Sequence, residues 1–155
     1  MATSTTLTAL NPREAIADAL HRCVLGMDNK DRELFESACV KDDSMTITAG
    51  PIQLEGWAAI NDFFGILSGV TTTHITSNIR IEVEDSAANT ASMTAHAIAY
   101  HVRPEDALKP EDTSYTASNL YFIDLIKDSN DGLWKIKKWV FKVLWTTGHR
   151  SVLYG

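Results

Sequence analysis

Four residues of the chain could together support proton transfer: Asp28, His74 and His101 as acid/base groups and Asn119 as a hydrogen-bond donor. A carboxylate beside an imidazole in a dry cavity fixes the tautomer of the ring and raises its basicity. Such a histidine can remove a proton next to a carbonyl group and return one elsewhere, which typically accelerates a reaction about 10²–10⁴-fold. An amide such as that of Asn119 can donate a hydrogen bond to an oxygen on which negative charge develops. These residues can perform acid/base chemistry if the fold brings them into one cavity.

Each of these residues also has an ordinary structural role open to it. A histidine in a strand is more often a packed or surface residue whose ring is satisfied. Asp28 could cap the helix that follows it, and Asn119 could tie two strands together. The coincidence of one acid, several imidazoles and one amide near apolar residues is what favours a functional site.

The elements that must position these residues begin with an aromatic-rich hairpin. Residues 115–126 and 133–145 predict two long β-strands, because β-branched and aromatic residues flank the polar turn 128–132. The many aromatic side chains of the second strand imply a large apolar surface that other elements cover. The lysines of this strand are expected on a solvated face: Lys135, Lys137, Lys138 and Lys142.

Three helices are expected before the long strands. Asn11, Pro12 and Glu14 form a helix-start pattern, in which Asn11 caps and Glu14 completes a capping box. Apolar residues then recur at helical spacing: Ala15, Ile16, Ala19, Leu20, Cys23, Val24 and Met27. We expect this helix to break at Asp28 and Asn29. Residues 30–38 predict a second helix and residues 57–67 a third, with a short strand at 44–49 between them.

Two further long strands are expected at 71–84 and 90–103, joined by a turn at 84–89, and residues 104–112 read as an exposed loop. His101 shares strand parity with the small residues Ala95, Ala97 and Ala99, whereas His96 lies on the other face. His74 lies on the face of its strand opposite to the isoleucines. It can reach the same cavity as His101 only if that part of the inward face is polar, or if a bulge shifts the register of the strand. The tail 148–155 is left unassigned.

Segregated helices and strands predict an α+β fold. We expect one domain spanning residues 1–155, with residues 1–10 a flexible tail, in which a curved antiparallel sheet forms a cone under three N-terminal helices. Such a cone has a cavity at its open end. Apolar residues are expected to bind substrate in this cavity: Met27, Trp57, Phe64, Tyr115, Tyr121, Phe141 and Trp145.

Composition excludes several classes of protein. The net charge is −6 and the calculated pI is about 5.3, with no basic stripe, so nucleic-acid binding is not expected. No apolar run is long enough to span a membrane and no signal-peptide pattern is present, which favours a cytoplasmic protein. Cys23 and Cys39 fall among apolar residues and are expected to be small buried side chains. No metal-ligand or phosphate-loop spacing occurs, so neither a metal nor a cofactor is expected.

The order of these segments resembles the SnoaL-like group of the nuclear-transport-factor-2-like fold, a cystatin-type cone, and is most similar to scytalone dehydratase and its relatives. The resemblance runs from about residue 11 to 145 and is carried by segments 27–31, 73–76, 117–120 and 132–136 together with His101. It implies a cofactor-free enzyme acting on a polycyclic or polyketide-like substrate. It also implies that Asp28 orients an active-site histidine, that His74 and His101 are the two strand histidines, and that Asn119 hydrogen-bonds a substrate oxygen.

The sequence therefore predicts a lyase or isomerase of secondary metabolism, acting by dehydration, isomerisation or cyclisation on a small hydrophobic polyketide- or terpenoid-like compound. In this prediction Asp28 and His101 form the oriented pair, His74 is a second acid/base group and Asn119 is the oxyanion donor. Two alternatives stay open: a non-catalytic binder of an apolar ligand, and a dimerisation module whose outer sheet face, with Val140 and Leu144, is the functional surface. An uncovered sheet face favours a homodimer in either case.

Overall fold

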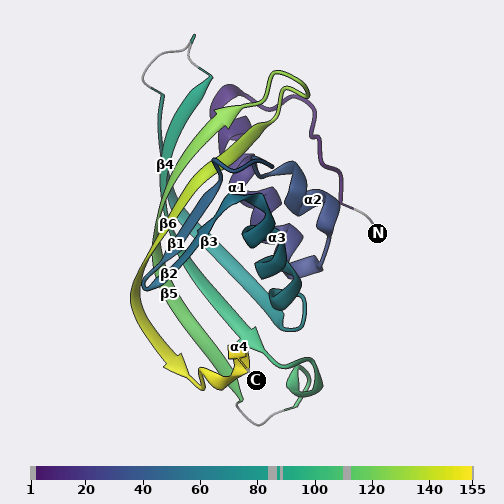
Figure 1. Ribbon diagram of the computed structural model, residues 1–155, viewed down its shortest axis with the longest axis vertical. Helices are drawn as coiled ribbons and strands as arrows, with labels where there is room; N and C mark the ends of the chain where they lie inside the picture. Colours follow the sequence, from purple (N-terminus) through teal and green to yellow (C-terminus); the bar gives the residue numbers. More distant parts are fainter. Residues whose placement is uncertain (1–2, 84–86, 88, 110–112, 155) are drawn as a thin grey trace.

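Six β-strands form one curved sheet, and helices lie on its concave side (Figure 1). The computed structural model describes residues 3–83, 87, 89–109 and 113–154. The helices are α1 Pro12–Asn29, α2 Arg32–Ser37, α3 Gly56–Leu67 and α4 Ser151–Tyr154, with a 3₁₀ turn, η1, at Pro104–Asp106. The strands are β1 Thr46–Ala49, β2 Ile52–Glu55, β3 Thr71–Glu82, β4 Thr90–Val102, β5 Ser114–Lys127 and β6 Trp134–Gly148. The α+β class and the helix-covered curved sheet are as predicted.

The sheet is mixed rather than wholly antiparallel. Its strand order is β2-β1-β6-β5-β4-β3, and β1 runs parallel to β6 while the other neighbouring pairs are antiparallel. Strand β2, which the sequence did not indicate, pairs with β1 across Gly50, where φ is +61°. Because β2 and β3 remain as free edges, the sheet is open.

Helix α1 begins with the predicted capping box. The Asn11 side chain accepts a hydrogen bond from the Glu14 N–H at 2.9 Å, and the Glu14 carboxylate accepts one from the Asn11 N–H at 2.9 Å. Helix α1 ends close to the break predicted at Asp28 and Asn29: both residues belong to its last turn, and the cap is Lys30, which adopts a left-handed φ of +57°. Asp31 caps α2 by accepting the Leu34 N–H, so Asp28 is free of any capping role.

The last turn of α1 packs very closely on α2. A Cβ atom placed on Gly26 would lie 2.5 Å from the backbone nitrogen of Phe35. Only a glycine allows the two helices to approach this far. Gly26 is therefore a packing residue that fixes the last turn of α1, including Asp28, against α2.

A bulge divides β3 into two halves of opposite parity. Ser77 pairs with His96 but Arg80 pairs with Thr94, so β3 carries one extra residue, and Asn78 there has a φ of +53°. Before the bulge the even-numbered positions face the helices: Thr72 is buried and His74 partly buried, whereas Ile75 is 53% exposed. The bulge is the feature that places His74 on the inner face of the sheet.

A second bulge lies near the end of the hairpin. Ser118 pairs with Trp145 and Asn119 with Val143, so β6 has one extra residue at Leu144. Residues directly opposite in a sheet point to the same face. Trp145 therefore shares the outer face with Ser118, although its odd number matches the inward residues Trp139 and Phe141.

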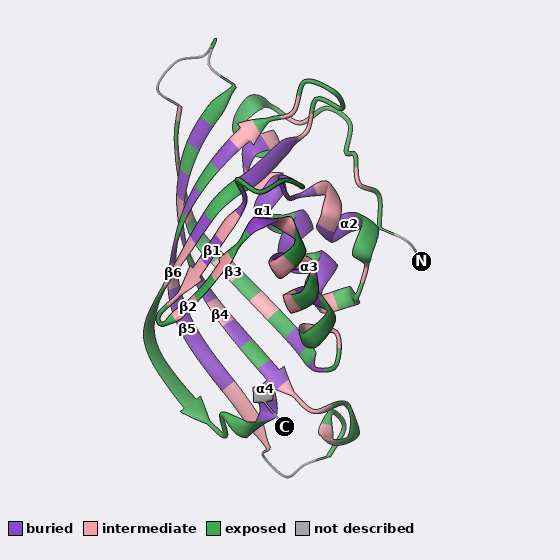
Figure 2. Ribbon diagram, viewed as in Figure 1, coloured by how far each residue is buried: buried purple, intermediate pink, exposed green. Residues whose placement is uncertain are grey.

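The core lies between the helices and the inner face of the sheet. Figure 2 shows the alternation of buried and exposed residues along the strands, most regularly in β4. Cys23 and Cys39 are free thiols and fully buried, as predicted. Most of the turn expected at 84–89 and the end of the loop expected at 104–112 lie outside the described residues, as do residues 1 and 2 of the expected tail.

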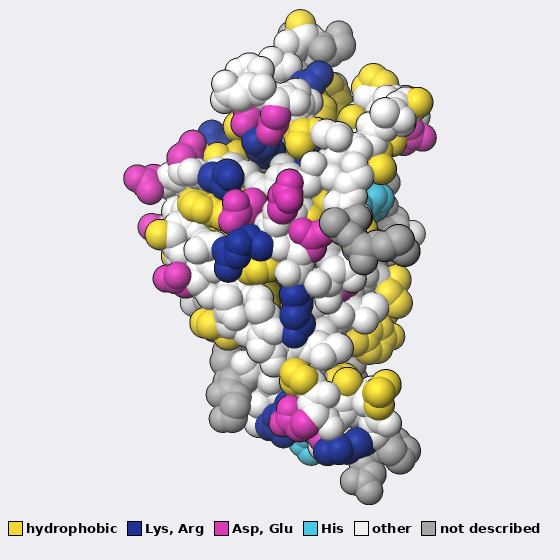
Figure 3. Space-filling model, turned by 90° about the vertical axis from the view of Figure 1, so that its right-hand side faces the viewer, with side chains coloured by type: hydrophobic (Ala, Val, Ile, Leu, Met, Phe, Trp, Pro, Cys, Tyr) yellow, Lys and Arg dark blue, Asp and Glu magenta, His cyan; other side chains and the backbone are white. Residues whose placement is uncertain are grey.

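The helical side of the molecule carries charges of both signs, interspersed with one another (Figure 3). Glu36, for example, lies 3.7 Å from Arg32 and 3.4 Å from Lys41. No helix among the described residues has the length and apolar character that crossing a membrane requires.

Candidate active site

A cavity of about 180 Å³, open to solvent at one end, lies between α1, α3, α4 and the inner face of the sheet. Its lining is mostly apolar, and every catalytic candidate except Asp28 contributes to it directly. The lining residues are Met27, Phe35, Ile47, Ala49, Ile52, Phe63, Phe64, Ile66, Leu67, His74, Ala99, His101, Tyr115, Ala117, Asn119, Tyr121, Trp139, Phe141, Val143, Arg150 and Leu153.

Asp28 and His74 form a buried hydrogen-bonded pair at the cavity wall. Nδ1 of His74 lies 2.7 Å from Oδ1 of Asp28, and the two side chains are 8% and 14% exposed. The Asp28 carboxylate also accepts the Thr72 hydroxyl and the backbone N–H of His74, each at 2.8 Å. Burial acts to raise the pKa of Asp28, but hydrogen bonds from His74 and Thr72 and the charge of His74 outweigh it and lower the pKa. The ionised carboxylate fixes the proton of His74 on Nδ1 and leaves Nε2 as the basic nitrogen.

The predicted pairing of Asp28 with His101 is wrong. In the pairing of β3 with β4, His101 lies opposite Thr72, whereas His74 lies opposite Ala99. The two histidines are therefore offset by two residues along the inner face of the sheet. Thr72 occupies the place beside Asp28, and Nδ1 of His101 instead lies 3.1 Å from the Tyr115 carbonyl oxygen. Since a carbonyl only accepts, this bond places the His101 proton on Nδ1.

The two histidine rings face the same cavity at close range. Their ring centroids are 6.2 Å apart and the rings are nearly perpendicular, at 81°. His101 is 7% exposed, and burial together with the charge of His74 lowers its pKa, against a smaller opposing effect of the Tyr115 carbonyl and Asp28. His101, rather than the exposed His96, is therefore the second imidazole of the cavity, and it is neutral near pH 7.

Replacing His101 with Gln is expected to make folding stability less sensitive to acid. An unfolded chain takes up a proton on this histidine near pH 6.5, while the folded chain resists it to lower pH. The unfolded state then binds more protons, so stability falls as the pH drops below about 6.5. Urea unfolding at pH 7.5 and pH 5.5 measures this loss. An equal loss in wild type and His101→Gln would contradict the assignment.

Asn119 is 4% exposed and lines the cavity from β5. Its amide nitrogen donates one long hydrogen bond of 3.4 Å, to the Ala117 carbonyl oxygen two residues away. This bond is weak at such a distance. The amide is therefore available for a group that enters the cavity.

Five of the seven apolar residues expected to bind substrate line the cavity: Met27, Phe64, Tyr115, Tyr121 and Phe141. Trp57 does not; its ring stacks on that of Phe35, with centroids 6.0 Å apart. Trp145 does not, because the bulge at Leu144 turns it to the outer face, where it is 50% exposed.

Arg150 and Leu153 at the C-terminus also line the cavity, and nothing in the sequence indicated them. Their position depends on Gly148, which has a φ of +88° and whose added Cβ would lie 2.1 Å from the Ser114 carbonyl oxygen. The chain turns there and brings α4 back toward β4 and β5. In the sequence, only Gly148 hinted at this turn, because glycine readily adopts a positive φ.

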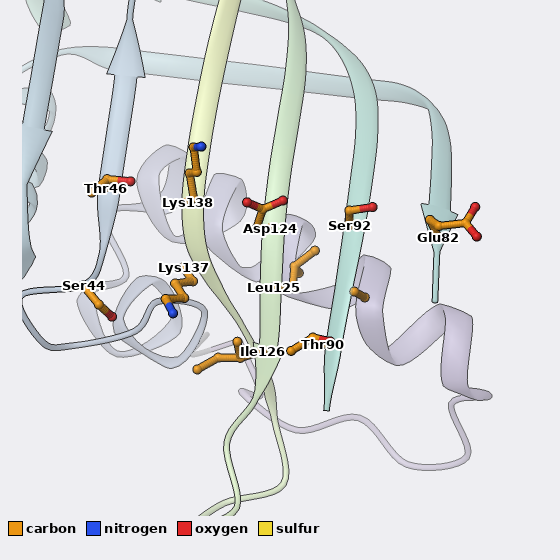
Figure 4. Close-up of a pocket in the computed structure, with 11 residues that line it drawn as sticks. Ser44, Thr46, Glu82, Thr90, Ser92, Asp124, Leu125, Ile126, Lys137 and Lys138 are labelled. Atoms are coloured by element: carbon orange, nitrogen blue, oxygen red, sulfur yellow. The ribbon is translucent and has the colours of Figure 1, made fainter. Parts of the chain in front are cut away.

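A second depression, of about 390 Å³, lies on the outer face of the sheet (Figure 4). It crosses a row of paired polar residues, Thr46, Lys138, Asp124, Ser92 and Glu82, of which Lys138 and Asp124 are direct cross-strand partners. It contains no histidine and lies on the opposite face from the Asp28–His74 pair. We therefore place the candidate active site in the cavity on the inner face of the sheet. Among the described residues, no three His, Cys, Asp or Glu side chains are grouped as a metal ion would require.

The fold and the site define a class: an open cone of nuclear-transport-factor-2 type with a carboxylate–histidine pair on the wall of an apolar cavity. The SnoaL-like domain family model matches residues 8–140, and the chain belongs to this family. A relative in Penicillium crustosum, terrestric acid biosynthesis cluster protein E, is 35% identical over 145 residues, which cover 93% of this chain and 90% of the relative.

Solved structures share the fold. A scytalone dehydratase candidate from Novosphingobium aromaticivorans has a TM-score of 0.74 at 20% identity, covering 89% of this chain and 87% of that protein. A type 2 hexachlorocyclohexane dehydrochlorinase has a TM-score of 0.70 at 19% identity, covering 87% and 86%. A nuclear-transport-factor-2-like protein from Salmonella enterica has a TM-score of 0.69 at 16% identity, covering 87% and 92%.

Proposed function

We propose that the protein is an enzyme that moves protons on a small hydrophobic secondary metabolite without a cofactor, as a lyase or isomerase. The observation that carries this proposal is the 2.7 Å contact between Asp28 and His74 at the wall of an apolar cavity. A histidine that is oriented by a buried carboxylate and lines an apolar cavity is the arrangement of a general base.

In this mechanism Nε2 of His74 takes a proton from a carbon next to a carbonyl group. Asp28 stabilises the imidazolium that forms, and the amide of Asn119 donates a hydrogen bond to the enolate oxygen. His101 is neutral with its proton on Nδ1, so its Nε2 can accept a proton at a second position, and the His74 imidazolium returns the proton that it took to the leaving hydroxyl group or to another carbon. The same steps serve elimination of water, movement of a double bond and ring closure.

The comparisons support the metabolic setting and the type of chemistry. The 35% identical relative is named for a biosynthetic cluster, which favours a polyketide- or terpenoid-like substrate. Two proteins of the same fold are named a dehydratase and a dehydrochlorinase, and both names denote eliminations that a base can initiate. The cavity of about 180 Å³ accommodates a compound of two fused rings.

Deuterium exchange tests the proposal without knowledge of the natural substrate. The small bicyclic ketone 2-tetralone has protons next to its carbonyl group that a general base can remove. Incubation with the protein in D₂O at pH 7, followed by ¹H NMR, is expected to show exchange faster than in buffer alone. Exchange no faster than with an equal concentration of imidazole would overturn the proposal for carbonyl compounds.

We further propose that the outer sheet face packs against a second copy of the chain. Ile75, Phe122 and Trp145 are 53%, 43% and 50% exposed on this face. Beside them lies the row that contains Asp124 and Lys138, whose opposite charges can pair with the same row of a copy related by a two-fold axis (Figure 4).

Replacing Val140 with Asp is expected to give a folded monomer, because Val140 lies opposite Phe122 at the centre of this face. Light scattering after size exclusion at about 50 µM measures the mass. The control is Leu25→Asp, which adds the same charge at a 42% exposed residue of α1. A wild-type protein that is already monomeric would exclude the dimer.

A further inference from the structure

The mouth of the cavity carries a permanent positive charge. Among the described residues that line the cavity, Arg150 is the only arginine, lysine, aspartate or glutamate. Its guanidinium group stays protonated across the whole pH range in which proteins are folded. Arg150 is exposed, as are the lining residues Ile66 and Val143, so these three residues mark the opening. The cavity therefore combines an apolar body with a cation at its entrance.

Contacts on both sides of Arg150 hold it at this entrance. The backbone N–H of His149 donates to the Ser114 carbonyl oxygen at 2.8 Å. The side chain of Arg103 donates to the carbonyl oxygen of Ser151 at 3.1 Å and to its hydroxyl oxygen at 3.3 Å. Figure 1 shows α4 on the concave side of the sheet, beside the ends of β4 and β5. The position of Arg150 is thus set by the fold.

A row of rings along one wall connects this entrance with the proposed base. Tyr115 pairs with Gly148, two residues before Arg150, and its ring centroid lies 5.7 Å from that of His101. The His101 ring in turn lies 6.2 Å from the His74 ring, centroid to centroid. All three rings line the cavity. A ligand held at Arg150 by one end therefore extends past His101 toward His74.

We propose that Arg150 binds an anionic group, a carboxylate or an ionised enol, of a ligand whose apolar body fills the cavity. This inference rests on the proposed function for the use of the cavity, and it narrows the substrate class to hydrophobic acids. A guanidinium group has five N–H donors, so two can hold a carboxylate while the others keep their contacts within the protein. At the entrance the anion stays partly hydrated, which avoids the cost of burying a charge. The bound anion fixes which end of the ligand reaches His74.

Two probes of nearly equal shape test the inference by binding alone. 2-Naphthoate and 2-naphthamide differ in one negative charge, and isothermal titration calorimetry at pH 7.5 measures both dissociation constants. Wild type is expected to prefer the naphthoate by at least about fivefold, since hydrogen bonds between two charged groups are the stronger ones. Arg150→Gln is expected to reduce this preference about tenfold, mainly through weaker naphthoate binding. Arg150→Lys should keep part of the preference, because an ammonium group retains the charge but not the planar fork.

The matched control is Arg80→Gln, which removes the same charge from an exposed residue of β3 outside the cavity lining and should keep the wild-type preference. Circular dichroism confirms that each variant is folded. Equal affinity of wild type for both probes, or binding of neither at millimolar concentration, would overturn the inference. So would an unchanged preference in Arg150→Gln. An equal loss in Arg80→Gln would also overturn it, because net charge rather than position would then decide binding.

The outcome is separable from that of the proposed function. A naphthoate preference that depends on Arg150, with no deuterium exchange of 2-tetralone by wild type, would support the anion site and refute proton transfer. Exchange that depends on His74, with no preference for naphthoate, would do the reverse.

Discussion

Replacing His74 with Gln is expected to lower protein-catalysed deuterium exchange of 2-tetralone about 10²–10⁴-fold, to the level of buffer. Glutamine keeps a hydrogen-bond donor near Asp28 but has no basic nitrogen. Asp28→Asn should also reduce exchange strongly, because an amide cannot stabilise the imidazolium and can impose the wrong tautomer on His74. Exchange rates come from ¹H NMR in D₂O under saturating probe, so that kcat is compared rather than binding.

The matched control is His96→Gln, which makes the same substitution on the outer face of the same sheet. His96 is exposed and lies 3.3 Å from the Asn78 amide, away from the cavity. This variant should exchange at the wild-type rate. Retention of more than about a tenth of the rate by His74→Gln would remove His74 from the mechanism.

The second large effect is expected at Gly26. In Gly26→Ala the new methyl group would lie 2.5 Å from the Phe35 nitrogen and 2.7 Å from its Cα, so α1 and α2 must separate. Overpacking against backbone costs about 3 kcal/mol, at the upper end of the usual range, because backbone cannot change rotamer. Denaturant unfolding monitored by circular dichroism measures the loss.

Gly65→Ala is the control for this prediction. Gly65 also lies within a helix, but an added Cβ would meet nothing within 4 Å. The exposed alanine should stabilise α3 by about 0.5–1 kcal/mol. Opposite signs for two chemically identical substitutions would establish the close approach of α1 and α2. Equal effects would show that glycine conformational entropy alone decides both.

The helical part of the fold could be predicted closely from the sequence because its signals are local. The capping box of Asn11 and Glu14 needs only three residues of spacing, and the apolar stripe of α1 is the face that is buried. The parity of β4 likewise placed His101 and His96 on opposite faces, since no bulge interrupts that strand, and the structure shows that His101 is the inward one.

The parts that could not be predicted depend on contacts between distant residues. The extra residues at Asn78 and Leu144 are set by how neighbouring strands pair, and each reverses the parity of the later residues in its strand. Asp28 pairs with whichever histidine lies nearer the end of α1. The register between β3 and β4 brings His74 there and leaves His101 behind Thr72. The contribution of Arg150 and Leu153 depends on a turn at Gly148 whose direction is fixed by contact with Ser114.

The bulge in β3 has a consequence for how this protein can evolve. Before the bulge, His74 lines the ligand cavity and Thr72 holds Asp28, whereas Ile79 and Ile81 beyond the bulge pack against the core. We therefore expect substitutions at Ile79 and Ile81 to affect folding, and substitutions at positions 72 and 74 to affect the ligand. Lineages that adopt new metabolites can diversify one segment of a continuous strand while the adjoining segment stays under constraint.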